Sequence, residues 1–445
     1  MFFSVSGLRG IVGEDLNFFS IYNYINVFCE YIKGENILIG CDTRPSSLPL
    51  SLAISGFLTW KGKKVFDAGV IPTPTFVYNT KFFDGGIIIT ASHNPSEYNA
   101  LKFASKGRLF SFKDFESFKE LLSKSKNDFS FVYGGEYNKY YEALNKHIEA
   151  ILQSPFVKVD AIRKNNFRVI VDCINGAGYK AIPILLEALH CKVECLNCEP
   201  TGKFVHNPEP TKDSLKELDR RVRSGDYDIG FAVDPDADRL VVALPDEGVL
   251  SEEYTLPLFA DYILNFEKSG IVCNLSTSRM VEDVSEYYGV DVFRTKVGES
   301  NVVDSMINLG YTIGGEGNGG VIFSKINLSR DSLLGIAFIL SKMALGFKII
   351  PDYIYGKYKM FKDKVNFSGR IDYKEIENFF YAKGLRPLKV CYEDGIRADF
   401  EYFWVHIRKS NTEPVVRIIG ETEIDFENKF REIFGELKRE IERWA

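Results

Sequence analysis

An apolar run at residues 86–89, GIII, leads directly into the polar stretch TASHNPSEYNALK at residues 90–102. Hydrophobic periodicity stops there, and the segment offers a nucleophile or group carrier, Ser92, with donors beside it and a movable proton donor, Lys102. A polar turn between a strand and a helix is the plain alternative, because short motifs match by chance. Three further polar loops of complementary chemistry favour the functional interpretation.

Strand-like and helix-length segments alternate around this stretch, which implies crossover connections. Predicted strands lie at residues 37–41, 64–66, 86–89, 167–172, 192–196, 228–233, 270–275 and 311–315. The pattern predicts an α/β fold with three similar α/β units whose sheets are mixed and largely parallel. Each unit places a polar loop at the carboxyl end of a strand, where open α/β sheets bind ligands.

The C-terminal part has a different pattern. Strand-like runs at residues 401–407 and 415–419 precede a helix whose apolar residues recur at helical spacing, from Phe426 to Ile441. This predicts a smaller α+β domain. Because 445 residues are too many for one hydrophobic core, we expect several domains. The predicted division is 1–138, 139–250, 251–360 and 361–445.

Two early segments point to the same site. The segment SGLRGIVG at residues 6–13 surrounds one arginine with glycines. Glycine lets the backbone approach a ligand closely, and the guanidinium of Arg9 is a fork suited to phosphate, although a plain turn is the alternative. The turn DTR at residues 42–44 is interpreted as scaffold near the site.

Three aspartates, Asp234, Asp236 and Asp238, alternate in a short loop held by Pro235. Carboxylates this close repel one another unless a cation neutralises them, and hard oxygen ligands select Mg²⁺ or Ca²⁺. An EF-hand is excluded, because no glycine stands at its sixth position and no glutamate at its twelfth. A solvated acidic turn is the alternative.

Two later loops are suited to bind polar groups. The loop GEGNGG at residues 315–320 offers Glu316 and Asn318 to vicinal sugar hydroxyls, and its glycines permit close approach. The loop RKSNTEP at residues 408–414, followed by Arg417, is built like an anion cradle, since arginine forks, hydroxyls and amides together satisfy phosphate oxygens. Ordinary glycine-rich and basic surface turns are the alternatives.

Composition limits the class of protein. Hydrophobic residues make up 45% and charged residues 26%, as in ordinary globular chains. The net charge of −6 gives no reason to expect nucleic acid. The N-terminus lacks the features of a signal peptide, and the most apolar segment, residues 333–350, contains two lysines and is interpreted as a buried helix. We expect a cytoplasmic protein with no membrane partner. The eight cysteines show no disulfide-framework spacing, and the cluster at residues 191–198 is interpreted as structural thiols rather than a zinc site, because a second ligand pair is missing.

The stretch at residues 90–102 resembles the phosphoserine loop of the α-D-phosphohexomutases, the superfamily of phosphoglucomutase, phosphomannomutase and phosphoglucosamine mutase. The segments at 6–13, 234–239, 315–320 and 408–417 match in the same order over nearly the whole chain. The resemblance implies an isomerase of carbohydrate metabolism that interconverts hexose 1-phosphate and hexose 6-phosphate. It further implies a phosphoserine enzyme, Mg²⁺ and a bound hexose 1,6-bisphosphate that also serves as activator.

The resemblance also implies roles for individual residues. The implied catalytic set is Ser92, His93, Lys102, Arg9 and Arg239. The implied metal set is Ser92, Asp234, Asp236 and Asp238. The implied substrate-binding set is Arg279, Lys296, Val297, Gly298, Glu316, Asn318, Arg408, Ser410, Asn411, Thr412 and Arg417. Many members have histidine where Gly320 stands here, so Lys102 is left as the strongest acid/base candidate.

Alternatives stay open at this point. A non-catalytic sugar-phosphate binding protein or a Mg²⁺-dependent sugar phosphatase would use a similar pocket. Residues 99–102 and 315–320 favour a phosphoglucosamine mutase, with phosphomannomutase/phosphoglucomutase as the other choice. The expected partner is a hexose phosphate substrate, and the expected state is a monomer or homodimer.

Overall fold

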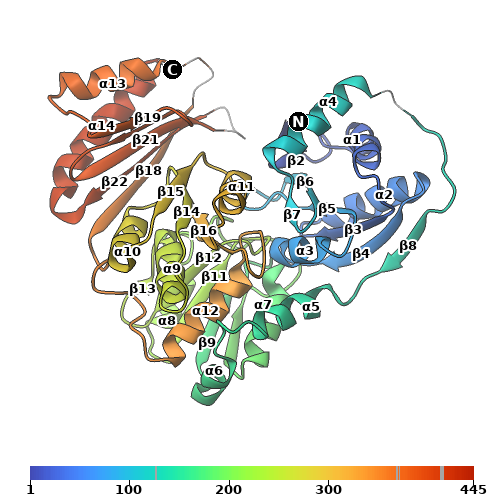
Figure 1. The fold of residues 1–445 in the computed structure, drawn as a ribbon, viewed down its shortest axis with the longest axis horizontal. Helices are drawn as coiled ribbons and strands as arrows, with labels where there is room; N and C mark the ends of the chain where they lie inside the picture. Colours follow the sequence, from blue (N-terminus) through green and yellow to red (C-terminus); the bar gives the residue numbers. More distant parts are fainter. Residues whose placement is uncertain (126–127, 367–368, 370, 411–414, 445) are drawn as a thin grey trace.

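The computed structural model describes residues 1–125, 128–366, 369, 371–410 and 415–444. Four β-sheets organise these residues. Figure 1 shows the N-terminal unit in blue and the C-terminal sheet in red at opposite ends of the molecule, with the second and third units between them. In this described part of the chain, no helix has the length and apolar character needed to cross a membrane.

The first sheet has the strand order β1-β2-β6-β5-β3-β4-β8, and β7 pairs with β6. Its strands are β1 Phe2–Ser4, β2 Gly7–Ile11, β3 Asn36–Cys41, β4 Lys64–Val70, β5 Gly85–Ile89, β6 Tyr98–Ser105, β7 Arg108–Leu109 and β8 Glu136–Lys139. Its helices are α1 Phe18–Tyr31, α2 Ser47–Trp60, α3 Thr73–Thr80 and α4 Phe112–Lys124. Alternate strand residues point to opposite faces, so Ile37 and Ile39 pack with α1, α2 and α4, whereas Leu38 packs with α3.

The second and third sheets have the orders β10-β9-β11-β12-β13 and β15-β14-β16-β17. The second unit contains α5 Ala143–Leu152, α6 Val159–Asn165, β9 Arg168–Asp172, α7 Gly178–Ala188, β10 Lys192–Leu196, α8 Lys216–Val222, β11 Ile229–Val233, β12 Leu240–Leu244 and β13 Gly248–Val249. The third contains η1 Glu252–Tyr254, α9 Thr255–Leu264, β14 Ile271–Asn274, α10 Met280–Tyr288, β15 Val292–Thr295, α11 Glu299–Leu309, β16 Ile313–Glu316, β17 Gly320–Phe323 and α12 Ser332–Ala344. One hydrophobic core runs through both units, and α12 is buried within it.

One arrangement of strands repeats in all three units. The orders β4-β3-β5-β6, β10-β9-β11-β12 and β15-β14-β16-β17 each join three parallel strands to a fourth, antiparallel strand. The three polar loops predicted in these units all lie in the turn between the third and the fourth strand. The predicted fold of three similar α/β units with mixed sheets is confirmed, and the shared topology brings the three loops to equivalent edges.

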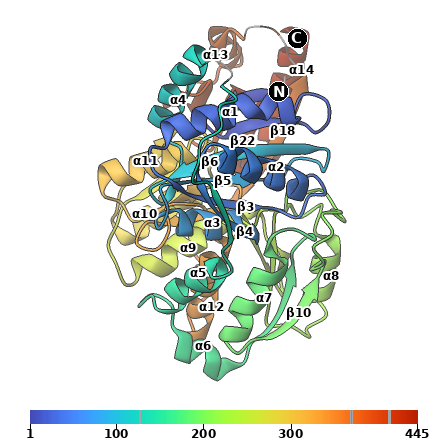
Figure 2. The same cartoon turned by 90° about the vertical axis from the view of Figure 1, so that its right-hand side faces the viewer.

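The C-terminal unit is a five-stranded antiparallel sheet of order β18-β22-β21-β20-β19. Its elements are β18 Tyr358–Asn366, α13 Tyr373–Ala382, β19 Lys389–Cys391, β20 Ile396–Asp399, β21 Phe403–Lys409, β22 Val415–Glu423, η2 Ile424–Phe426 and α14 Glu427–Trp444. Side chains of α13 and α14 pack on this sheet. Figure 2 shows both helices at the top of the molecule. The predicted α+β unit is confirmed. The limits 138/139 and 360/361 fall inside β8 and β18, so the division by residue number stays a prediction.

Two segments predicted as loops contain strands. Gly7, with φ +102°, turns a hairpin between β1 and β2, and a Cβ there would lie 2.2 Å from the carbonyl oxygen of Leu101. The second half of the 90–102 stretch is β6, which pairs with β2 so that Arg9 lies opposite Ala100. Lys102 is therefore delivered by a strand rather than by a flexible turn. The pairing partners are distant in sequence, so local composition did not show them.

Candidate active site

Ser92 lies in the turn after β5, where its backbone adopts φ +50°. Non-glycine residues seldom occupy this left-handed region, and such strain gathers at functional sites. The side chain is 4% exposed. Its Oγ donates a hydrogen bond to Asp234 Oδ2 at 3.0 Å, and His93 Nδ1 lies 3.4 Å away. The nucleophile candidate of the first unit thus contacts the acidic loop of the second.

Arg44 holds the Ser92 turn in place through hydrogen bonds to its backbone. It is 2% exposed and pairs through Nε with Asp42 at 3.0 Å. Its two terminal nitrogens donate to four backbone carbonyls, those of Ser92 at 2.6 Å, Asn94 at 2.6 Å, Pro95 at 2.5 Å and Tyr98 at 3.1 Å. These bonds confirm the interpretation of the 42–44 turn as scaffold.

We expect Arg44→Lys to destabilise the protein and to lower turnover together. An ammonium group cannot reproduce the planar fork, and each buried carbonyl left without a donor costs about 1–3 kcal/mol. The total loss should reach at least about 3 kcal/mol of unfolding free energy, measured by urea unfolding. The exposed Arg168→Lys is the matched control. Equal stability of Arg44→Lys and that control would contradict the scaffold role.

The acidic loop between β11 and β12 buries all three of its aspartates. One oxygen from each of Asp234, Asp236 and Asp238 lies within 4.8 Å of the others. Asp234 Oδ1 accepts backbone N–H groups of Asp238 and Arg239, both at 3.1 Å. Asp236 Oδ2 accepts from Thr73 Oγ1 and from Lys102 Nζ, both at 2.7 Å. Hydrogen bonds from protein donors therefore orient the carboxylates of Asp234 and Asp236.

These carboxylates fit a divalent cation. In the part of the chain that the structure describes, Asp236 Oδ1 and Asp238 Oδ1 are buried without a hydrogen-bond partner. Buried polar atoms are normally satisfied, so two unpartnered carboxylate oxygens in one short loop indicate a site that can bind a cation. Three hard oxygen donors beside Ser92 suit Mg²⁺.

The electrostatics agree with that assignment. Burial and repulsion from the neighbouring carboxylates raise the pKa of Asp234 well above its usual range, and burial also raises the pKa of Asp238. Burial alone would raise the pKa of Asp236 too, but the ion pair with Lys102 lowers it. A cation bound among the three would relieve the repulsion that the first two show.

Lys102 and His93 are fixed in opposite protonation states. Burial disfavours the Lys102 ammonium, but Asp236 and Asp238 outweigh it and raise its pKa, so Lys102 is protonated. Burial and the nearby guanidinium of Arg239 hold the pKa of His93 well below its usual range. Its neutral ring lies with Nδ1 2.8 Å from Arg239 Nη2 and can accept from it. Lys102 can donate a proton here, whereas His93 is a poor base.

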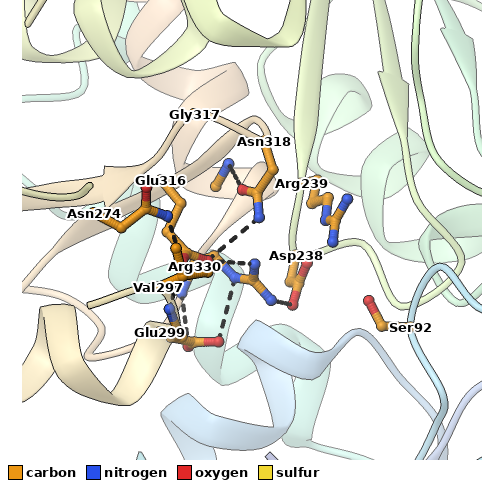
Figure 3. A network of polar contacts seen from close by, with 12 residues as sticks. Ser92, Asp238, Arg239, Asn274, Val297, Glu299, Glu316, Gly317, Asn318 and Arg330 are labelled. Atoms are coloured by element: carbon orange, nitrogen blue, oxygen red, sulfur yellow. Dashed lines mark hydrogen bonds and ion pairs between the residues drawn. The ribbon is translucent and has the colours of Figure 1, made fainter. Parts of the chain in front are cut away.

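The segment at residues 315–320, the sugar loop, presents Glu316 at the end of β16 as a fixed anion. Burial would raise its pKa, but Arg330 and hydrogen bonds from Asn274 and Gly298 lower it. Glu316 Oε1 accepts from Asn274 Nδ2 at 2.8 Å and from Gly298 N at 3.0 Å, and Asn318 Nδ2 lies 3.3 Å from Oε2 (Figure 3). A charged, oriented carboxylate suits sugar hydroxyls.

Two arginines face each other on the C-terminal sheet. Arg408 on β21 is the direct cross-strand partner of Arg417 on β22, an arrangement that is repulsive unless anions compensate it. Arg408 Nε pairs with Asp394 at 3.0 Å, and Arg408 Nη2 is buried without a hydrogen-bond partner among the described residues. Asn411 and Thr412 lie outside the described residues. The pair of guanidinium groups suits a phosphate.

All four units meet around one cavity of about 260 Å³. Its lining includes Ser92, His93, Lys102, Arg9, Arg239, Val297, Gly298, Glu316, Asn318, Arg408, Ser410 and Arg417 from the predicted sets. Among the described residues, seven lysines and arginines and four glutamates line it, so the cavity is net positive. A small anionic ligand is the natural occupant.

Two residues of the implied substrate-binding set, Arg279 and Lys296, lie outside the lining of the cavity, and their role stays a prediction. Arg279 does not line the cavity; its Nη2 donates to the carbonyl of Phe400 at 2.8 Å and its N–H to Glu421 at 2.8 Å, so it joins the third unit to the C-terminal sheet. Lys296 is exposed and also lies outside the lining. Arg279 directly precedes α10, and Lys296 directly follows β15.

The sequence analysis missed several charged residues of the cavity. They are Glu209, Glu253, Arg330 and Lys362. Glu209 pairs with Arg239 at 3.0 Å, and burial raises the pKa of Glu253 to about 7 although Lys362 pairs with it at 2.8 Å. None of these residues stands in a motif. Isolated charged residues carry no local signal, and only the fold gathers them.

Comparisons with known proteins address the whole chain. Sequence profiles described as phosphoglucomutase/phosphomannomutase, alpha/beta/alpha domains I, II and III match residues 1–124, 145–248 and 251–359. A Thermococcus kodakarensis phosphoglucomutase/phosphomannomutase is 35% identical over 97% of this chain and 96% of its own length. The chain belongs to the α-D-phosphohexomutase superfamily. This phosphohexomutase is therefore an enzyme of the isomerase class, which moves a phosphoryl group within a hexose.

One more relative and one solved structure are similar to this phosphohexomutase. A Methanopyrus kandleri protein assigned as a phosphoglucosamine mutase is 32% identical over 98% of this chain and 96% of its own. A solved structure from Thermus thermophilus, assigned as a phosphomannomutase, superposes with a TM-score of 0.84 at 23% identity, covering 99% of this chain and 98% of the other. That likeness confirms the fold of this phosphohexomutase.

Proposed function

We propose that this phosphohexomutase works through a phosphorylated Ser92 and a bound hexose 1,6-bisphosphate. The contact between Ser92 Oγ and Asp234 Oδ2, at 3.0 Å, carries the proposal. It places a strained, buried hydroxyl at the edge of the acidic loop and inside a net positive cavity. A hydroxyl in that position can hold a phosphoryl group that surrounding donors stabilise.

The chain's own residues account for the transfer in both directions. Phosphorylated Ser92 gives its phosphoryl group to the free hydroxyl of the hexose phosphate, which forms the bisphosphate. After the sugar reorients, the other phosphate returns to Ser92 Oγ. Arg9 and Arg239 line the cavity as donors to the transferring oxygens. Asp234, Asp236, Asp238 and the phosphoserine would hold Mg²⁺, which would neutralise charge developing on those oxygens.

Lys102 is the group placed to move the proton. Protonated Lys102 gives its proton to the departing Ser92 Oγ, and the neutral amine that results takes the proton that the attacking hydroxyl releases, so the step is balanced. Asp236 holds Lys102 protonated at 2.7 Å, which suits it to give a proton to the departing oxygen. Its position on β6, one strand from the Ser92 turn, keeps it at a fixed place in the cavity lining.

Glucosamine phosphate is the substrate we favour. An ammonium group at C2 needs an anionic acceptor, and glutamate side chains line the cavity beside the sugar loop. Relatives named for glucosamine, mannose and glucose phosphates all match most of this chain. Relative kcat/KM on the three hexose phosphates decides the matter. A preference of about tenfold or more for mannose or glucose phosphate would reject this choice.

Intact-mass analysis of the active enzyme tests the phosphoserine. We expect one phosphate that maps to Ser92 and exchanges with labelled hexose phosphate. Full activity from enzyme with an unmodified Ser92 would overturn the proposal. A coupled assay with trace glucose 1,6-bisphosphate also separates mutase from sugar phosphatase, because only the phosphatase releases inorganic phosphate.

Arg408→Ala is expected to weaken the binding of both glucose 1-phosphate and glucose 6-phosphate by about tenfold. The reason is that either phosphate would occupy the Arg408–Arg417 pair in alternate halves of the cycle. Isothermal titration with each ligand measures the effect, and the exposed Arg386→Ala on the same unit is the control. Weakening of one phosphate alone would show that the pair does not serve both.

A further inference from the structure

Arg330 lies where the acidic loop and the sugar loop meet, just before α12 (Figure 3). It is 8% exposed and lines the cavity. Its Nη2 donates to Asp238 Oδ2 at 2.5 Å, and its Nη1 donates to Glu316 Oε2 at 2.9 Å. Its Nε lies 3.3 Å from Glu299 Oε2. One guanidinium thus contacts three carboxylates from separate segments of the chain.

Gly320 makes room for this side chain. A Cβ on Gly320 would lie 2.1 Å from Cδ and 2.8 Å from Cγ of Arg330. Gly320 is not among the residues with positive φ, so its backbone would accept an ordinary residue. Glycine is required here for space and not for conformation. Any side chain at position 320 would compete with the stem of Arg330.

We propose that Gly320 and Arg330 form a matched pair in which the empty space at 320 lets Arg330 position Asp238 and Glu316 together. The inference rests on the proposed function, which gives Asp238 to the metal and Glu316 to the sugar. Arg330 acts here as a positioning residue.

The bonding of the two carboxylates explains how one side chain serves both loops. Arg330 donates a hydrogen bond to Asp238 Oδ2 only. The other oxygen, Oδ1, is buried and unpartnered among the described residues, so it is available to another ligand. On the other side Arg330 donates to Glu316 Oε2, while Asn274 donates to Glu316 Oε1. A planar fork with five donors can hold both groups at once, and a lysine ammonium cannot keep that geometry.

Two variants that keep the positive charge test the inference, Arg330→Lys and Gly320→Ala. The first loses the fork, and the second leaves Arg330 intact but pushes its stem aside. We expect each to weaken Mn²⁺ binding, followed by electron paramagnetic resonance, by about tenfold. We expect a similar loss in glucose 6-phosphate binding measured by calorimetry without divalent cation. Neither measurement requires turnover, so both stand apart from the mutase assay.

Matched controls separate positioning from general destabilisation. Gly56→Ala adds a Cβ where nothing lies within 4 Å, and Arg168→Lys changes an exposed arginine. Both should bind the two ligands like the wild type. Coupling gives a second readout: once Arg330→Ala has removed the side chain, adding Gly320→Ala should have no further effect on either affinity.

The outcomes divide clearly. Loss of both affinities with non-additive effects supports the pair. Unchanged affinities in Arg330→Lys, loss of only one of them, a lowered Tm as the sole effect, or additive effects in the double variant would each overturn it. A wild type that binds no Mn²⁺ would instead refute the metal assignment of the proposed function, and the inference would fall with it.

Discussion

Replacing Ser92 with alanine is expected to abolish mutase turnover, by about 10⁴-fold or more, because the group that carries the phosphoryl between the two hydroxyls is removed. The backbone strain of φ +50° is about the same for alanine as for serine, so the substitution adds no strain to the turn. The variant loses the hydrogen bond to Asp234 and the longer contact with His93 Nδ1. We therefore expect Tm to stay within a few degrees, measured beside kcat in the coupled assay.

Ser96→Ala is the matched control for this variant, because Ser96 lies in the same turn but is exposed and outside the cavity lining. It should retain wild-type turnover. Ser92→Ala protein should also show no phosphate by intact mass after incubation with glucose 1,6-bisphosphate. Substantial isomerisation by Ser92→Ala would mean that phosphate moves without a serine carrier, and the proposed mechanism would be wrong.

Local chemistry was readable from the sequence because each motif is contiguous. Ser92 and the three aspartates stand in short segments whose residue types already limit the chemistry. The alternation of strands and helices likewise predicted three α/β units, because buried strands and helices each give the apolar residues a characteristic spacing in the sequence. What the structure adds is their meeting, with Ser92 Oγ 3.0 Å from Asp234 across a sequence separation of 142 residues.

The antiparallel fourth strand of each unit was not predicted. The strands β12 and β17 are short and almost wholly buried, so they lack the alternation that marks a half-buried strand. Arg330 was missed for a related reason. Its importance comes from Asp238, Glu299 and Glu316, and no spacing in the sequence brings those residues together. Tertiary partners decide such positions.

Arg279 shows a case in which a resemblance implies a role in substrate binding, whereas the structure shows contacts with the C-terminal sheet. Its guanidinium donates hydrogen bonds to backbone carbonyls of the C-terminal unit, including that of Phe400. A positive charge near a predicted ligand contact can either bind the ligand or join two units of the protein. Only the direction of the side chain at the start of α10 distinguishes them.

Asp236→Asn is expected to stop turnover, by about 10³-fold or more, while the fold survives. The amide keeps the volume of the carboxylate but removes one of three anionic oxygens within 4.8 Å of one another. Two effects on stability oppose each other. Repulsion within the acidic loop falls, and the 2.7 Å ion pair with Lys102 is lost. We therefore expect Tm to change by no more than about 5 °C.

The decisive measurement for Asp236→Asn is activity against Mg²⁺ concentration in buffer stripped of metal. Wild-type enzyme should lose activity on stripping and regain it with Mg²⁺, whereas the variant should stay inactive at every concentration. Asp213→Asn, an exposed change in the same unit and outside the cavity lining, controls for the loss of one negative charge. Wild-type activity of Asp236→Asn in stripped buffer would contradict the metal assignment, because the loop would then support transfer without the charge that it was proposed to supply to the cation.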